Sequence, residues 1–145
     1  MAHAFQFLDD IAMADLAFDA SGDSLQELFQ GATDAVIEAM ANPVTIGSTW
    51  QQAIERTDAD PAALLFDWLC DVVYWKDAAG VVFSKSDVRL SPQADGLWSL
   101  KARLHGEPID STTQELRADV KGVTKHLFRL AEAGGRWTVR VVLDV

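Results

Sequence analysis

Apolar residues recur about every 3.6 positions in two segments of the chain, which predicts two amphipathic helices. The first segment runs from Ser24 to Ala41. Ser24 and Glu27 have the spacing of a capping box, in which side chains satisfy free backbone N–H groups at the start of a helix. Asn42-Pro43 then ends the helix, because the residue before a proline avoids the helical conformation.

The second predicted helix follows Asp60, which serves as its N-cap, with Pro61 in the first helical position. Its apolar stripe passes through Leu65, Trp68, Leu69, Val72 and Trp75. Ala79-Gly80 ends it, because glycine readily adopts the left-handed conformation found after many helices.

Elsewhere apolar and polar positions alternate, which predicts strands. These strands are expected around Leu16/Phe18/Ala20, Val81 to Leu90, Trp98/Leu100/Ala102/Leu104, His126 to Ala131, and Trp137/Val139/Val141/Leu143. Asp95-Gly96 and Gly134-Gly135 are typical of hairpin turns, so the sheet should be largely antiparallel. Two main helices packed on one such sheet give an α+β, two-layer fold. Because no repeat or linker interrupts the pattern, we expect a single domain over residues 1–145.

The charge balance narrows the range of functions. Lys and Arg number 12 against 22 Asp and Glu, a formal net charge of −10. The summed field of such a chain repels a phosphate backbone and attracts cations or basic protein surfaces. Autonomous nucleic-acid binding is therefore disfavoured.

The signatures of common enzymes are missing from the sequence. It has no Gly-rich phosphate loop, nucleophile elbow, zinc-ligand spacing or dinucleotide fingerprint. Cys70 is the single cysteine and is expected to be a small core residue rather than a reactive thiol. His105 and His126 have no third partner nearby in the sequence, so both are expected to be structural.

Carboxylates gather near both ends of the chain. Asp9, Asp10 and Asp15 lie in the stretch FLDDIAMAD. The chain closes with Asp144-Val145, whose free carboxylate adds another hard oxygen ligand. The two ends together could supply a cation site.

Strand parity supports this interpretation. With Leu16 and Leu143 facing the core, Asp15 and Asp144 project from the opposite face of their strands. If the two strands are neighbours, their carboxylates converge. Such oxygen ligands suit Ca²⁺ or Mg²⁺ rather than zinc. The residues alone leave a second interpretation open, in which these Asp side chains are only solvated at strand ends.

The segment from His105 to His126 is polar and long for a connection inside a compact domain, which makes it a candidate functional loop or a mobile crossover. Within it Lys121 is flanked by Glu115 and Asp119. This lysine could contact a phosphate or form a surface ion pair of small energetic value.

The order of these features resembles the archease family over nearly the whole chain. The most specific matching pieces are the GEP-x-D run from Gly106 to Asp110, the VK-x-VT-x-H run from Val120 to His126, and the ending Leu143-Asp144. The opening FLDDIAMADLAF and both helices match the family as well.

The resemblance implies a function that the pattern alone does not. Archeases are small proteins that assist the RtcB-type RNA ligase, a metal- and GTP-dependent enzyme that joins RNA ends carrying a 3′-phosphate or cyclic phosphate to 5′-hydroxyl ends. This chain would then be no enzyme itself but an activator that promotes guanylylation and multiple turnover of the ligase, in tRNA splicing or RNA repair. RNA would be an indirect partner, reached through the ligase.

The resemblance also implies a site. A divalent metal, calcium with magnesium or manganese as alternatives, would be held by Asp15, Asp144 and Val145. Lys121 would contact the ligase or a phosphate. The first motif reads DDIAMAD where many members have DHTAD, and Ser111 to Gln114 follow the GEP-x-D run in place of a Lys-His pair, so the metal preference stays open.

Two functions of other classes remain as alternatives. The same acids could serve a metal-dependent phosphohydrolase, or the chain could be a chaperone-like protein-binding module whose metal stabilises the fold. Neither a signal peptide nor an apolar stretch long enough for a bilayer is recognised, so we expect a cytoplasmic location without membrane partners.

Overall fold

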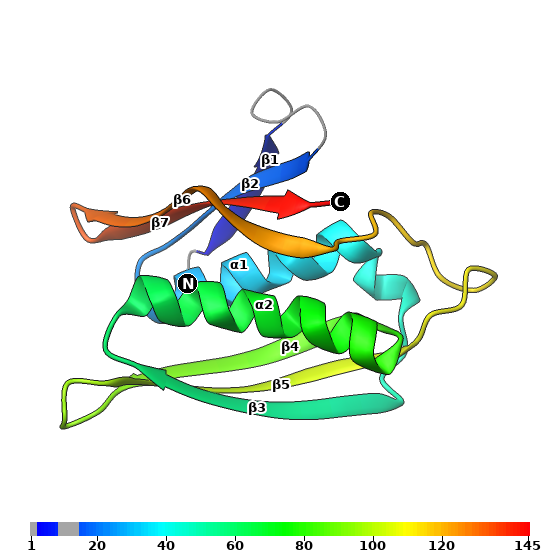
Figure 1. Ribbon diagram of the computed structural model, residues 1–145, viewed down its shortest axis with the longest axis horizontal. Coiled ribbons are helices and arrows are strands. Elements are labelled where there is room, and N and C mark those ends of the chain that lie inside the picture. Colours follow the sequence, from blue (N-terminus) through cyan, green and yellow to red (C-terminus); the bar gives the residue numbers. More distant parts are fainter. Residues whose placement is uncertain (1–2, 9–14) are drawn as a thin grey trace.

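The computed structural model describes residues 3–8 and 15–145. Its elements follow one another along the chain as shown in Figure 1: β1 (Ala4–Leu8), β2 (Asp15–Gly22), α1 (Leu25–Met40), the short 3-10 helix η1 (Pro43–Thr45), β3 (Trp50–Asp58), α2 (Pro61–Ala79), β4 (Val81–Pro92), β5 (Trp98–Pro108), β6 (Gly122–Ala133) and β7 (Arg136–Asp144). Both helices and five of these strands, β2, β4, β5, β6 and β7, correspond to segments predicted from the sequence.

The two helices are capped as the sequence predicts. Ser24 caps α1, because its Oγ accepts a hydrogen bond from the backbone N–H of Glu27 at 3.1 Å. Asp60 caps α2 by accepting from the backbone N–H of Ala62 at 3.0 Å. Gly80 follows α2 in the left-handed conformation, with φ at 65°. Within the described residues, neither helix is both long and apolar enough to cross a membrane.

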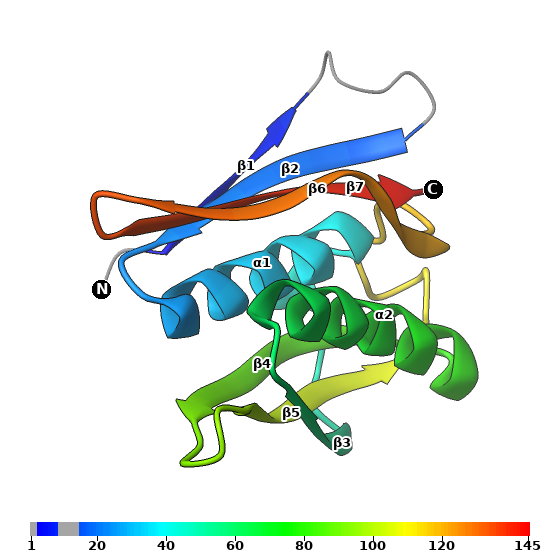
Figure 2. The ribbon, with the colours of Figure 1, turned by 60° about the vertical axis from the view of Figure 1, so that its left-hand side comes forward.

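The strands of the described residues form two antiparallel sheets, with the orders β1-β2-β7-β6 and β3-β5-β4. Figure 2 shows α1 and α2 lying between these sheets. The predicted α+β class, the two main helices and the antiparallel pairing are confirmed. The strands divide between two sheets rather than forming one, so the fold has three layers where the sequence predicted two.

The third layer follows from features that a single apolar stripe does not reveal. Helix α1 is buried on more than one side, and a helix of that kind packs between two layers. Its buried residues are Leu25, Leu28, Phe29, Gly31, Ala32, Thr33, Ala35, Val36, Ile37, Ala39 and Met40. Strands β1 and β3 were not predicted, and both lie at sheet edges. On β3 the polar residues Gln52 and Arg56 share a face with Trp50 and Ile54, which obscures the alternation.

One buried hydrogen bond joins the two helices of the middle layer. Trp68 of α2 donates through Nε1 to Oγ1 of Thr33 in α1, at 2.8 Å. The Thr33 hydroxyl in turn donates to the carbonyl oxygen of Phe29 at 2.7 Å. Trp68 and Thr33 are completely buried, so neither group can turn to water.

Replacing Thr33 by Val should therefore destabilise the fold. The change keeps the shape of the side chain but leaves the indole N–H of Trp68 buried without an acceptor, which costs about 1–3 kcal/mol. Urea denaturation followed by tryptophan fluorescence measures this loss. The matched variant Thr138→Val, at an exposed position of β7, should change the free energy of unfolding by less than about 0.5 kcal/mol. Equal stability of the two variants would contradict the role of the Trp68 bond.

Candidate functional site

The antiparallel register of the four-stranded sheet brings the start of β2 next to the end of β7. Asp15 at the start of β2 lies directly opposite Asp144 at the end of β7. Leu16 and Leu143, next to them, pair with each other and pack in the core. Because side chains alternate along a strand, Asp15 and Asp144 share the outer face of the sheet. These are the two side chains that strand parity selected, and Figure 2 shows the start of β2 beside the end of β7.

The other predicted site residues occupy different positions relative to this pair. Val145 follows Asp144 directly and is half-buried, with its side chain packed against the core. The backbone N–H of Lys121 donates to the carbonyl oxygen of Asp144 at 2.7 Å, so Lys121 lies beside the pair. Asp9 and Asp10 lie outside the described residues.

The strand on the far side of β7 leaves space next to Asp144. Gly122 of β6 is paired with Asp144, and a Cβ added at Gly122 would meet no atom of residues 3–8 or 15–145 within 4 Å. Two positions further along, Thr124 is paired with Val142 and so shares the outer face. The Oγ1 atom of Thr124 is buried and has no hydrogen-bond partner among the described residues. An open space and an unsatisfied oxygen thus accompany the two carboxylates.

These groups define which ions the site could hold. Among residues 3–8 and 15–145, no group of three or more His, Cys, Asp or Glu side chains could hold a metal ion. A cation at Asp15 and Asp144 would therefore need main-chain oxygens, a hydroxyl or water to complete its coordination. Calcium and magnesium accept such oxygen ligands, whereas zinc favours imidazole and thiolate ligands. The donor set fits a hard divalent cation.

Lys76, which was not among the predicted site residues, holds the neighbouring loop in place. Lys76, in the last turn of α2, is buried, with 5% of its surface exposed. Its Nζ donates to Oδ1 of Asp119 at 2.8 Å and to the carbonyl oxygen of Val120 at 2.7 Å. Nζ also lies 3.0 Å from Oδ1 of Asp77. Lys76 thereby fixes the two residues that precede Lys121.

The electrostatics of this lysine favour its charged form. Burial lowers the pKa of Lys76, but the hydrogen bonds to Asp119 and Asp77 outweigh burial and raise it above its ordinary value. The same hydrogen bond, together with the charges of Lys76 and Lys121, lowers the pKa of Asp119. The sequence carries a signal for Lys76: it lies one helical turn after Val72, on the apolar stripe of α2.

The polar loop after β5 folds around one buried glutamine. Gln114 donates through Nε2 to Oε1 of Glu107 at 3.1 Å and to the carbonyl oxygen of Pro108 at 2.9 Å. Its Oε1 accepts from the backbone N–H of Asp110 at 2.7 Å. Gln114 belongs to the segment that departs from the family pattern, and here it holds the GEP-x-D run together.

Steric and electrostatic contacts also fix the start of that run. A Cβ at Gly106 would collide with the carbonyl oxygen of Val82 on β4, so only glycine fits. The backbone N–H of Gly47 donates to the carboxylate of Glu107, and this bond, followed by that from Gln114, lowers the pKa of Glu107. The run is therefore engaged in contacts within the fold.

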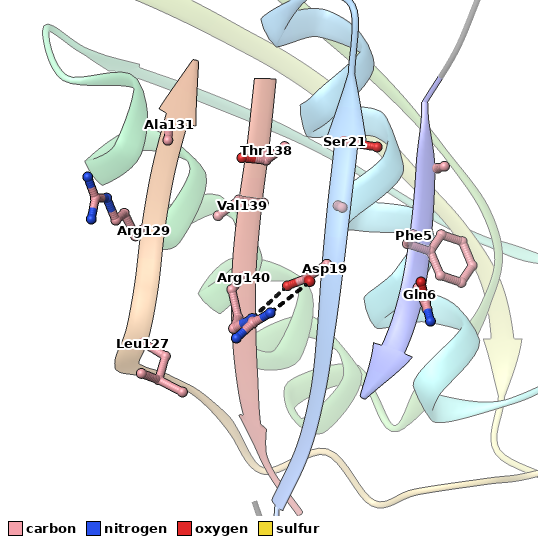
Figure 3. Close-up of a pocket in the computed structure, with 12 residues that line it drawn as sticks. Phe5, Gln6, Asp19, Ser21, Leu127, Arg129, Ala131, Thr138, Val139 and Arg140 are labelled. Atoms are coloured by element: carbon pink, nitrogen blue, oxygen red, sulfur yellow. Dashed lines mark hydrogen bonds and ion pairs between the residues drawn. The ribbon is translucent and has the colours of Figure 1, made fainter. Parts of the chain in front are cut away.

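A hollow of about 570 Å³ lies on the four-stranded sheet, lined by residues of β1, β2, β6 and β7. Figure 3 shows Asp19 and Arg140 joined across β2 and β7 within it, with Nε of Arg140 at 2.8 Å from Oδ1 of Asp19. The hydroxyl of Ser21, which also lines the hollow, accepts from Nη2 of Arg136 at 2.9 Å. No nucleophile paired with a general base is found among the described residues that line it.

Cys70 and His105 differ in how far they are buried. Cys70 is only partly buried, which corrects its expected place in the core. Burial and two neighbouring carboxylates raise the pKa of its thiol, so little reactive thiolate forms. His105 is buried with Nε2 at 3.1 Å from Oδ2 of Asp87, as expected of a structural histidine.

Replacing Lys76 by Met should weaken the fold near the carboxylate pair. The variant keeps the apolar stem of the side chain but leaves the carbonyl oxygen of Val120 without its donor, which should cost about 1–2 kcal/mol. Urea unfolding of Lys76→Met gives this value. The control is Lys85→Met at an exposed position of β4, where we expect a change within about 0.5 kcal/mol. A loss no larger than in the control would rule out the anchoring role.

Comparison with known proteins extends over almost the whole chain. A model of the Archease protein family matches residues 5–145. The protein archease of Methanothermobacter thermautotrophicus is 33% identical over 141 residues, which cover 97% of this chain and 98% of that protein. The protein archease of Methanosarcina mazei is 28% identical over 132 residues, covering 91% of this chain and 90% of that protein.

Two solved structures share the fold. The solution structure of Methanobacterium thermoautotrophicum protein 1598 has a TM-score of 0.79 and 30% identity, and covers 97% of this chain and 98% of its own. The crystal structure of a Thermotoga maritima archease, described as a possible chaperone, has a TM-score of 0.62 and 20% identity, with 91% of each chain covered. The likeness to the second structure concerns the fold alone.

Proposed function

The chain belongs to the archease family, and on that premise we propose that it activates an RtcB-type RNA ligase instead of catalysing a reaction alone. The observation that carries the proposal is the position of Asp15 directly opposite Asp144 on the outer face of the sheet. In the part of the chain that the structure describes, the hollow on the same sheet is lined by Asp19 and Arg140 rather than by this pair, and it lacks a nucleophile with its base. An accessory role therefore fits the chain better than hydrolysis.

The carboxylates of Asp15 and Asp144, with the main-chain oxygens of Val145, would hold a divalent cation. Calcium is the first choice, with magnesium and manganese as alternatives, because all three accept oxygen ligands. The buried hydroxyl of Thr124 and the open space at Gly122 support a site on this face. When bound, the ion supplies positive charge that can offset the charge of phosphate groups during guanylylation.

Lys121 would contact a phosphate or a carboxylate of the ligase. Its backbone is held at both sides, by its own bond to the carbonyl oxygen of Asp144 and by the bonds from Lys76 to the two preceding residues. The side chain itself is exposed. A cation on a fixed backbone loses less conformational entropy on binding than one on a mobile loop.

The first experiment measures ligase–guanylylate formation and RNA ligation by an RtcB-type enzyme with limiting GTP and substoichiometric amounts of this chain. We expect the wild-type chain to stimulate both, and Asp144→Asn to abolish the stimulation, because the variant keeps the side-chain shape but removes its charge. Glu55→Gln is the matched control: it removes one carboxylate charge from an exposed position of β3 and should stimulate fully.

The outcomes separate the alternatives. No stimulation by the wild-type chain would contradict the proposed activity. Full stimulation by Asp144→Asn would contradict the proposed site. A chaperone-like module, in line with the words "possible chaperone" given to the Thermotoga maritima archease, would instead show a lower melting temperature on chelation and no effect of Asp144→Asn on the ligase. Turnover of a phosphoester by the isolated chain would favour the phosphohydrolase.

Metal binding has its own test in Gly122→Val. Valine suits a strand, and the space at this position is open, so the fold should tolerate it. The added side chain would crowd Asp144 and should weaken calcium binding roughly tenfold, a loss typical of changes next to metal ligands. Calorimetric titration of the wild-type chain and the variant with calcium measures the effect. The proposed site is wrong if both bind calcium equally, provided that their melting temperatures agree without calcium.

A further inference from the structure

The outer face of the three-stranded sheet carries a cluster of basic side chains that contrasts with the net charge of −10 of the whole chain. The residues of this basic face are all exposed: Lys85, Arg89, Lys101 and Arg103. They lie on the two neighbouring strands β4 and β5. The same face presents the carboxylates of Glu55 and Asp87, so four cations stand beside two anions.

The register of β4 and β5 sets two of these cations against each other. Lys101 lies directly opposite Arg89 of β4, a like-charge pairing that destabilises a sheet, and on its other side it lies opposite Glu55 of β3. Arg103 lies opposite Asp87, but the Asp87 carboxylate is bonded to Nε2 of His105 at 3.1 Å. None of the four basic side chains forms an ion pair with a residue that the structure describes.

Basic residues on the rest of the surface are more often paired. Arg140 lies 2.8 Å from Asp19, and Arg136 lies 2.8 Å from Asp23. A face that keeps its cations unpaired, at some cost in sheet stability, has charge available for an external anion. A hollow of about 450 Å³ on this face is lined by three of the four cations, Arg89, Lys101 and Arg103.

We propose that the basic face binds the phosphate backbone of RNA without reading its sequence. Phosphate contacts need only suitably placed charges and hydrogen-bond donors. A protein partner generally needs an aromatic or large apolar anchor at the centre of its contact. The exposed positions between the charges hold small or polar residues such as Ala53 and Thr57, and no aromatic side chain lines the hollow among the described residues. Charge complementarity therefore favours a polyanion over a protein surface.

The net charge of the chain limits the affinity but does not prevent the contact. At physiological salt, charges more than about 8 Å away are largely screened, so the local cations dominate the field at the hollow. Helices separate this face from the outer face that carries Asp15 and Asp144 (Figure 2), so bound RNA would leave the carboxylates free. A weak contact gains effect when another protein holds the same RNA, because its effective concentration rises.

The proposal goes beyond the ligase role and is tested without a ligase. The isotope-labelled full chain is titrated with a single-stranded RNA of about twelve nucleotides, and backbone amide shifts are recorded by NMR at several salt concentrations. We expect shifts confined to β3, β4 and β5. The double variant Lys101→Gln/Arg103→Gln should weaken binding roughly tenfold and lower the slope of log K against log salt by about 1.4.

A matched variant controls for net charge. Lys125→Gln/Arg129→Gln removes two exposed cations from β6 in the other sheet, and should change the affinity less than about twofold because those charges are screened from the basic face. Three results would overturn the proposal: no shifts with RNA, shifts confined to the four-stranded sheet, or tighter binding of an oligoglutamate peptide than of RNA. Ligase stimulation is a separate measurement, so its failure would leave this test unchanged.

Discussion

The pairing of β2 with β7 ties the early part of the chain to its last strand, and the outer face of the four-stranded sheet depends on its register. Side chains alternate along both strands, with Phe18 and Val141 in the core and Asp15 and Asp144 outside. A slip of one residue would exchange the two sets and place carboxylates in the core. The free energy of burying the apolar set thus also determines where the carboxylates lie. The bond from Lys121 to Asp144 depends on a second register, that of β6 with β7, which pairs Gly122 with Asp144.

Local rules predicted the features that depend on few neighbouring residues. Ser24 and Asp60 cap their helices because a short side chain can reach a backbone N–H in the next turn, which involves no distant residue. The layer arrangement depends on how far around each helix is buried, and on edge strands whose polar residues hide the alternation. Gln52 of β3 is an example, since it lies on the face of that strand that packs inward.

The candidate site likewise combines residues that a local pattern predicts with residues that it does not. Parity along two strands was sufficient to select Asp15 and Asp144, because the core fixes which face each strand turns outward. Lys76 and Asp119 are 43 residues apart in sequence, and no local pattern joins them. The basic face was not predicted from the net charge for another reason. Net charge adds all the charges of the chain together, whereas binding depends on charges within a Debye length of one another. A chain of net charge −10 can therefore present a cationic surface.

The collision that a side chain at Gly106 would make with Val82 has a consequence for how such chains are recognised. The GEP-x-D run is one of the most specific pieces of the sequence, yet its glycine is required by the spacing of two strands, and Glu107 by its bonds to Gly47 and Gln114. A sequence signature of this kind records how a loop is built. Chains that carry it share a scaffold, and their chemistry has to be judged from the residues that this scaffold leaves exposed.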